Sequence, residues 1–229
     1  MTAPDRCVGG RAPRRSLAWG LAWAIAVASP SAVAATLTVH VVTPDGQPAP
    51  GVVVEVVMPA AAVRVPAEPV VVAQLGLRFV PQVTAVPAGT TVRFTNQDSF
   101  DHHLRSQPAG PLGSIAPAKD FEFRMPAARP DAPVFTDVRF DRAGLVVLGC
   151  HLHSAMRGYL YIAESALLGV TDAAGRAVIP SLPDGRAEVR TWHPQQLSEQ
   201  TSVALQLASE NRLTVALNFK PAPARPARR

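Results

Sequence analysis

Short segments rich in valine and threonine recur along this chain of 229 residues, and turn-forming proline, glycine and aspartate residues separate them. In the segment 90–95, Val92 and Phe94 alternate with polar neighbours, as a half-buried β-strand requires. No stretch shows a sustained helical period with capping residues. The pattern therefore predicts an all-β fold built as a sandwich. The expected strands are 36–42, 51–58, 77–80, 82–86, 90–95, 121–123, 134–140, 145–150, 159–163, 177–179, 188–192, 202–207 and 213–219.

Residues 1–34 have the features of a signal peptide. A basic stretch at 11–15 precedes the apolar run 17–28, and small residues at 32–34 offer a cleavage site. The apolar run is too short to span a bilayer, so we expect no membrane span after cleavage. The mature protein is expected in the periplasm, exported by the Sec route, although the adjacent pair Arg14-Arg15 also permits a twin-arginine signal.

Removal of this segment changes what the charge and the cysteines imply. It takes away four arginines and one aspartate, so the formal net charge falls from +5 to +2. A nearly neutral body argues against a nucleic-acid partner, and the Pro/Ala-rich basic tail 221–229 is expected to be disordered. Cys7 leaves with the signal, so Cys150 is the single cysteine of the mature chain. It is a buried inert thiol, a link to another chain or a metal ligand.

The segment 149–156 favours the metal ligand. It places a thiolate, an imidazole and a thioether at Cys150, His153 and Met156, which a tight loop can direct to one point. A second imidazole is available at His102. Two histidines, one cysteine and a weak axial methionine are diagnostic of a mononuclear blue-copper site. Zinc has little use for a thioether, and one cysteine is too few for an iron–sulfur cluster.

Other interpretations of these residues stay open at this point. Met156 could instead fill a gap in the core, because methionine is flexible and apolar. His103 could replace His102, although the spacing favours the latter. His151 could compete for the metal, but adjacent residues of an extended chain point to opposite sides. Asp98 is expected in a turn whose hydrogen bonds support the ligands.

These motifs resemble the cupredoxins, and specifically the plastocyanin-like or methylamine utilization protein group of bacterial periplasmic proteins. The likeness covers most of the mature chain in the same order. The matching residues are Phe94-Thr95-Asn96-Gln97-Asp98, His102-His103, Pro117-Ala118-Lys119-Asp120-Phe121-Glu122, Cys150, His153, Met156, Gly158-Tyr159, Thr171-Asp172, Leu182-Pro183 and Trp192-His193-Pro194.

The resemblance implies one copper ion held by His102, Cys150, His153 and Met156, with His102 as the upstream ligand. It also shows a departure, because residues 107–115 look like an insertion. We expect this insertion to lengthen a loop near the site and to affect solvent access to the copper.

The flanks resemble a second family, the carboxypeptidase-regulatory or transthyretin-like sandwich. Its patterns match residues 42–52 and 171–185, which lie on either side of the copper-binding stretch. We therefore expect a cupredoxin Greek-key β-sandwich at 63–165, inserted in a discontinuous second sandwich made of 35–62 and 166–220. A single enlarged β-sandwich would produce similar strand counts.

The leading functional hypothesis is a periplasmic one-electron carrier with redox partners such as a cytochrome or a dehydrogenase. The alternatives are a protein that stores or delivers copper in the cell envelope, and a β-sandwich module that binds an envelope ligand. An enzyme is not expected, because the sequence offers no acid/base pair, no nucleophile with a base and no second metal cluster.

Overall fold

The computed structural model describes residues 35–59 and 62–222, so the expected signal peptide and most of the expected disordered tail lie outside the described residues. Within this part of the chain the fold is all-β, and its one helical element is the 3-10 turn η1 (Pro111–Gly113). No helix of the described residues is long and apolar enough to cross a membrane. The predicted all-β class is confirmed.

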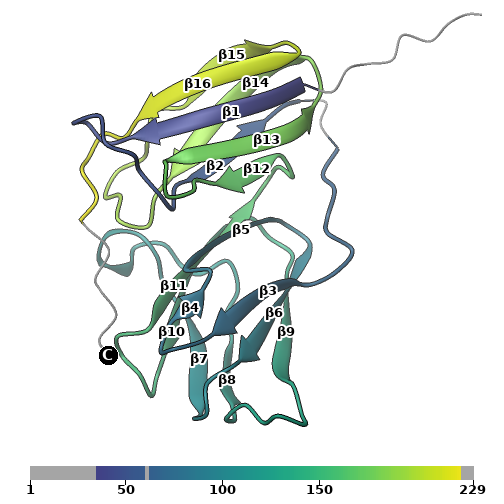
Figure 1. Ribbon diagram of the computed structural model, residues 1–229, viewed down its shortest axis with the longest axis vertical. Coiled ribbons are helices and arrows are strands. Elements are labelled where there is room, and N and C mark those ends of the chain that lie inside the picture. The colour runs from purple at the N-terminus through teal and green to yellow at the C-terminus, as the bar shows by residue number, and fades with distance from the viewer. Residues whose placement is uncertain (1–34, 60–61, 223–229) are drawn as a thin grey trace, which may run out of the picture. The chain divides into compact units, whose positions relative to one another are not determined.

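Two sheets share the first hydrophobic core, and Figure 1 shows their strands in the upper part of the picture. Their strand orders are β13-β1-β16 and β12-β2-β14-β15. Alternate residues of β1 are fully buried in this core, because one face of the strand packs inward. The strands are β1 (Ala35–Val42), β2 (Val53–Val57), β12 (Leu168–Val170), β13 (Arg176–Leu182), β14 (Gly185–Trp192), β15 (Val203–Leu207) and β16 (Glu210–Ala216).

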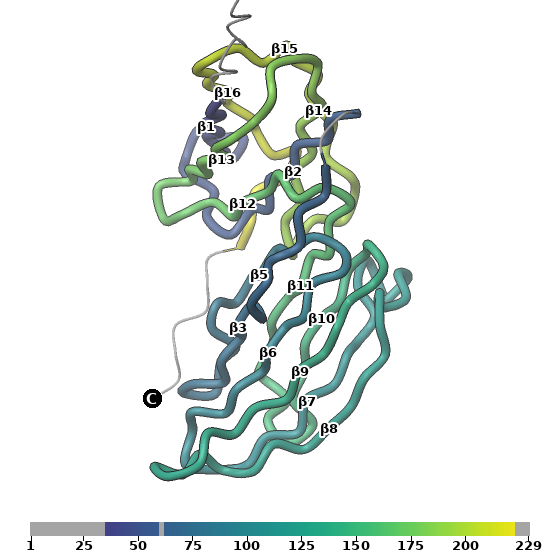
Figure 2. Tube along the Cα trace, turned by 90° about the vertical axis from the view of Figure 1, so that its right-hand side faces the viewer, coloured from purple at the N-terminus to yellow at the C-terminus, as the bar shows by residue number. Residues whose placement is uncertain are grey.

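The second core lies between two other sheets, and the sequence that builds it falls between the two parts that build the first. The strand orders are β4-β3-β6-β9 and β5-β11-β10-β7-β8. Figure 2 shows these strands side by side. The family assignment of the two sandwiches stays a prediction. The strands are β3 (Val70–Gln74), β4 (Phe79–Val80), β5 (Val83–Pro87), β6 (Thr90–Asn96), β7 (His102–Gln107), β8 (Glu122–Met125), β9 (Val134–Phe140), β10 (Gly144–Cys150) and β11 (Arg157–Ala163).

The strand β6 has the alternation that the sequence predicted. Val92 and Phe94 are fully buried, and their neighbours are partly exposed. Three strands were missed by the sequence analysis: β3, β7 and β12. The strand β7 is mostly polar, and it is a strand because it pairs with β10 on one side and with β8 on the other.

A buried carboxylate links β2 to β11. Glu55 is only 2% exposed. Its two oxygens accept hydrogen bonds from the hydroxyl of Tyr161 at 2.8 Å and from the backbone N–H of Ser165 at 2.9 Å. These bonds compensate the cost of removing the carboxylate from water.

Candidate metal centre

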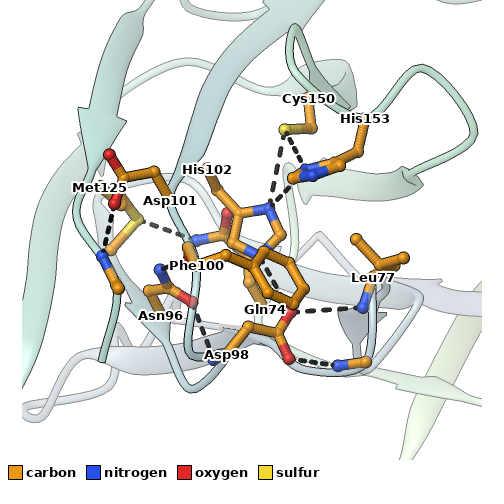
Figure 3. A network of polar contacts seen from close by, with 12 residues as sticks. Gln74, Leu77, Asn96, Asp98, Phe100, Asp101, His102, Met125, Cys150 and His153 are labelled. Carbon is orange, nitrogen blue, oxygen red and sulfur yellow. Dashed lines mark hydrogen bonds and ion pairs between the residues drawn. The ribbon is translucent and has the colours of Figure 1, made fainter. Parts of the chain in front are cut away.

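The pairing of β7 with β10 brings two predicted ligands together. His102 is the first residue of β7, and Cys150 is the last residue of β10. Cys150 pairs with Leu104 across the sheet, and its Sγ accepts a hydrogen bond from the backbone N–H of His103 at 3.4 Å. His153 follows in the loop before β11, and Figure 3 shows its ring beside the sulfur of Cys150.

Three donor atoms surround one point. Sγ of Cys150 lies 3.7 Å from Nδ1 of His102 and 3.6 Å from Nδ1 of His153, and the two Nδ1 atoms are 3.2 Å apart. The centre of a triangle with these sides is about 2.0 Å from each corner, close to the bond lengths of roughly 2.0 to 2.3 Å that nitrogen and sulfur ligands make with a transition-metal ion. The residues therefore fit a metal ion of this size.

A carboxylate orients His102. The Nε2–H of this ring donates a hydrogen bond to Oδ2 of Asp98 at 2.9 Å, so the lone pair of Nδ1 is directed at the other two donors. Burial lowers the pKa of His102, which favours the neutral, metal-binding form of the ring.

Asp98 is itself held in place. Its carboxylate also accepts the backbone N–H of Gly76 at 2.7 Å and that of Leu77 at 3.3 Å. Burial of the carboxyl opposes ionisation, but the hydrogen bonds from Gly76, His102 and Leu77 outweigh it and lower the pKa of Asp98. The expected supporting turn around Asp98 is thus present, and its backbone N–H is bound by the side chain of Asn96 at 2.9 Å.

The site is closed on one side and reaches the surface on the other. His102 is fully buried and Cys150 is 4% exposed, whereas His153 is partly exposed. The ring of Phe100 lies 5.2 Å from the ring of His102 and 5.3 Å from that of His153, centroid to centroid. The contact of Phe100 was not predicted, since an aromatic residue in a loop gives no sequence signal of such a contact.

The remaining candidates have different surroundings. Met156 is 2% exposed and belongs to the same hydrophobic core as Cys150, and its role as the axial ligand stays a prediction. His103 is not part of the three-donor cluster, because alternation along β7 turns it to the other face, where its Nε2 pairs with Glu122 at 3.0 Å. His151 is exposed and also lies outside the cluster.

The insertion at 107–115 does not lengthen a loop beside His102, contrary to the expectation from the sequence. The strand β7 carries the chain away from His102 to Gln107, which pairs with Val147 in the middle of β10. The segment 107–115 then closes on itself through a bridge between Ala109 and Ile115. The insertion follows the end of β7 opposite to the ligands, because an extended strand of six residues separates the two by its own length.

Comparisons with known proteins give a limited result. No protein-family model matches this chain, and no curated protein matches it. A solved copper-containing nitrite reductase from Thermus scotoductus SA-01 is 23% identical over 55% of this chain, with a TM-score of 0.36. Amicyanin from Paracoccus versutus is 22% identical over 48% of this chain, with a TM-score of 0.33. The match spans 28% of the nitrite reductase chain and 97% of the amicyanin chain.

Proposed function

We propose that this chain is a cupredoxin-like copper protein that carries single electrons. The proposal rests on the convergence of one thiolate sulfur and two imidazole nitrogens around a space that fits a metal ion. A thiolate suits Cu(I) and imidazoles keep Cu(II) accessible, so His102, Cys150 and His153 form a donor set for both states. Met156 is proposed as the weak axial ligand.

Copper held by this set would gain and lose one electron between Cu(II) and Cu(I). The protein residues contribute rigidity and exclude water. Asp98 restrains the ring of His102, and the backbone pairing of β7 with β10 restrains Cys150. Because ligands held in this way move little when the charge changes, the cost of reorganisation on electron transfer is low.

The partly exposed His153 is proposed as the route for electrons to and from the surface. Two apolar side chains accompany it, because Phe100 is 39% exposed and contacts its ring, and the adjacent Leu152 is 51% exposed. Exposed apolar side chains of this kind suit transient docking of a protein partner. We propose a periplasmic redox protein, such as a cytochrome or a dehydrogenase, as that partner.

The test is the spectrum of the copper-loaded mature protein. We expect an intense visible band from thiolate-to-copper charge transfer and a reversible one-electron couple. Cys150→Ser should abolish the band, whereas His40→Ala, at an exposed strand position, should leave it unchanged. A protein that binds copper yet stays colourless and redox-silent would contradict the carrier.

Incubation of the copper-loaded protein with an apo-acceptor protein separates the carrier from a protein that delivers copper. A carrier is expected to retain its ion in the presence of an apo-acceptor protein, because its ligands are buried and preorganised. Rapid transfer of the ion to the acceptor would instead support delivery.

A further inference from the structure

A second group of side chains of metal-binding type lies next to the buried donors in the sequence but points to the opposite side. His103 follows His102 in β7 and His151 follows Cys150 at the end of β10, so each points away from the buried donors. The backbone holds the two together, because the N–H of His151 donates to the carbonyl oxygen of His103 at 2.8 Å.

The two imidazole rings lie near each other, although the donor atoms of His103, His151 and Glu122 are not all within 4.8 Å of one another as those of the buried cluster are. The ring centroids are 5.7 Å apart, compared with 5.0 Å for His102 and His153. Metal binding by all three residues therefore requires the exposed side chain of His151 to rotate toward His103.

A carboxylate completes the group. Oε1 of Glu122 lies 3.0 Å from Nε2 of His103. Among the described residues Glu122 forms no ion pair with an arginine. The neighbouring Arg124 is instead bound to Asp101 through two nitrogen atoms, at 2.6 and 3.0 Å, which offsets its positive charge.

We propose that His103, His151 and Glu122 form a second, solvent-exposed site for a divalent transition-metal ion such as Zn²⁺ or Cu²⁺. Two imidazoles and a carboxylate are an established donor set for these ions, with water filling the open positions. The site contains no sulfur, so Cu²⁺ bound there would lack the colour of a copper thiolate. This proposal does not depend on the function of the buried donors.

The decisive experiment is a Zn²⁺ titration, by calorimetry, of untagged mature protein carrying Cys150→Ser and His153→Ala. These changes remove two of the three buried donors. We therefore expect one equivalent of Zn²⁺ to bind, at the site of His103, His151 and Glu122. Adding His103→Ala or His151→Ala should weaken that binding at least about tenfold, and Glu122→Gln should weaken it as well. His40→Ala is the matched control at another exposed histidine and should change nothing.

Paramagnetic resonance with Cu²⁺ gives an independent measurement. The same background should show a tetragonal copper signal coupled to imidazole nitrogen, lost in His103→Ala. If the background variant loses its β circular-dichroism spectrum, wild-type protein already loaded with one Cu(I) is titrated with Zn²⁺ instead. Absence of the additional equivalent, or its persistence without His103 and His151, would overturn the proposal.

Discussion

The ring of His102 donates its Nε2–H to Oδ2 of Asp98 at 2.9 Å, and both side chains are buried. This contact matters because a histidine that binds a metal through Nδ1 needs its other nitrogen protonated and held. The negative carboxylate also raises the electron density available at the ring. Asp98 is therefore positioned to affect the metal without touching it.

We predict that Asp98→Asn weakens copper binding about tenfold to a hundredfold, because the hydrogen bond that orients His102 loses its charge. The reduction potential should rise, since removing a negative charge destabilises Cu(II) more than Cu(I). Chelator competition and voltammetry measure the two effects. Asp101→Asn is the matched control, because Asp101 pairs with Arg124 and not with a ligand. Equal behaviour of the two variants would argue against a specific role for Asp98.

Met156 can be tested by a change that preserves volume. Met156→Leu should cost less than about 1.5 kcal/mol of stability, because the two side chains are similar in size. The reduction potential should nevertheless rise if the thioether is the axial ligand. Met125→Leu is the control, since Met125 is 1% exposed in the same core but contacts Gln74. A potential unchanged in Met156→Leu would assign this methionine to packing alone.

Tyr161→Phe should lower the free energy of unfolding by about 1–3 kcal/mol, because it removes a hydrogen bond from the buried carboxylate of Glu55. Denaturant titration of the protein measures this loss. Tyr159→Phe is expected to cost less, since Tyr159 contacts the same Trp192 ring but does not bind Glu55. Similar losses in both variants would show that the hydrogen bond adds little.

Tyr159 and Tyr161 should ionise only at high pH in the folded protein. Burial raises the pKa of Tyr159, and burial together with the nearby Glu55 raises the pKa of Tyr161 further. Tyrosinate absorbance of the folded protein should therefore appear well above pH 10, and the unfolded chain should titrate near about 10. Since the unfolded state releases these protons first, stability should fall as the pH rises above about 10. An ordinary titration curve in the folded protein would contradict the buried placement.

Gly175 should not tolerate a side chain. Its φ is +70°, and a Cβ there would lie 2.5 Å from the carbonyl oxygen of Val41 and 2.9 Å from the backbone nitrogen of Ala49. Gly46 has a similar φ of +78° but open space around it. Gly46→Ala should cost about 1–2 kcal/mol for the left-handed backbone, and Gly175→Ala about 1–3 kcal/mol more for the clash. Thermal unfolding of the two variants compares them directly.

Local patterns were sufficient for part of this structure. The alternation around Val92 and Phe94 predicted a strand with one buried face, because side chains of a strand point to opposite sides. The spacing of Cys150 and His153 predicted two donors on one short loop, and the structure places their donor atoms 3.6 Å apart. Periodicity and spacing are properties of a few consecutive residues, so they can be read without knowing the fold.

Other features depend on which distant segments pair. The polar segment of β7 carries little strand preference, and its pairing with β10 and β8 makes it a strand. The pairing of β7 with β10 leaves the insertion at the end of β7 away from His102. The pairing of β7 with β8 places Glu122 beside His103. The contact of Phe100 with both histidine rings follows from the same convergence of loops.

The β class and the cluster of His102, Cys150 and His153 could thus be inferred from residue types and their order, and the signal peptide stays a prediction. The contact of Phe100 with both histidine rings, the pairing of His103 with Glu122 and the second group of imidazoles required the folded chain. The physical reason is the register between β7 and β10. A shift of one residue would exchange the buried and exposed histidines of β7, and local sequence alone does not set that register.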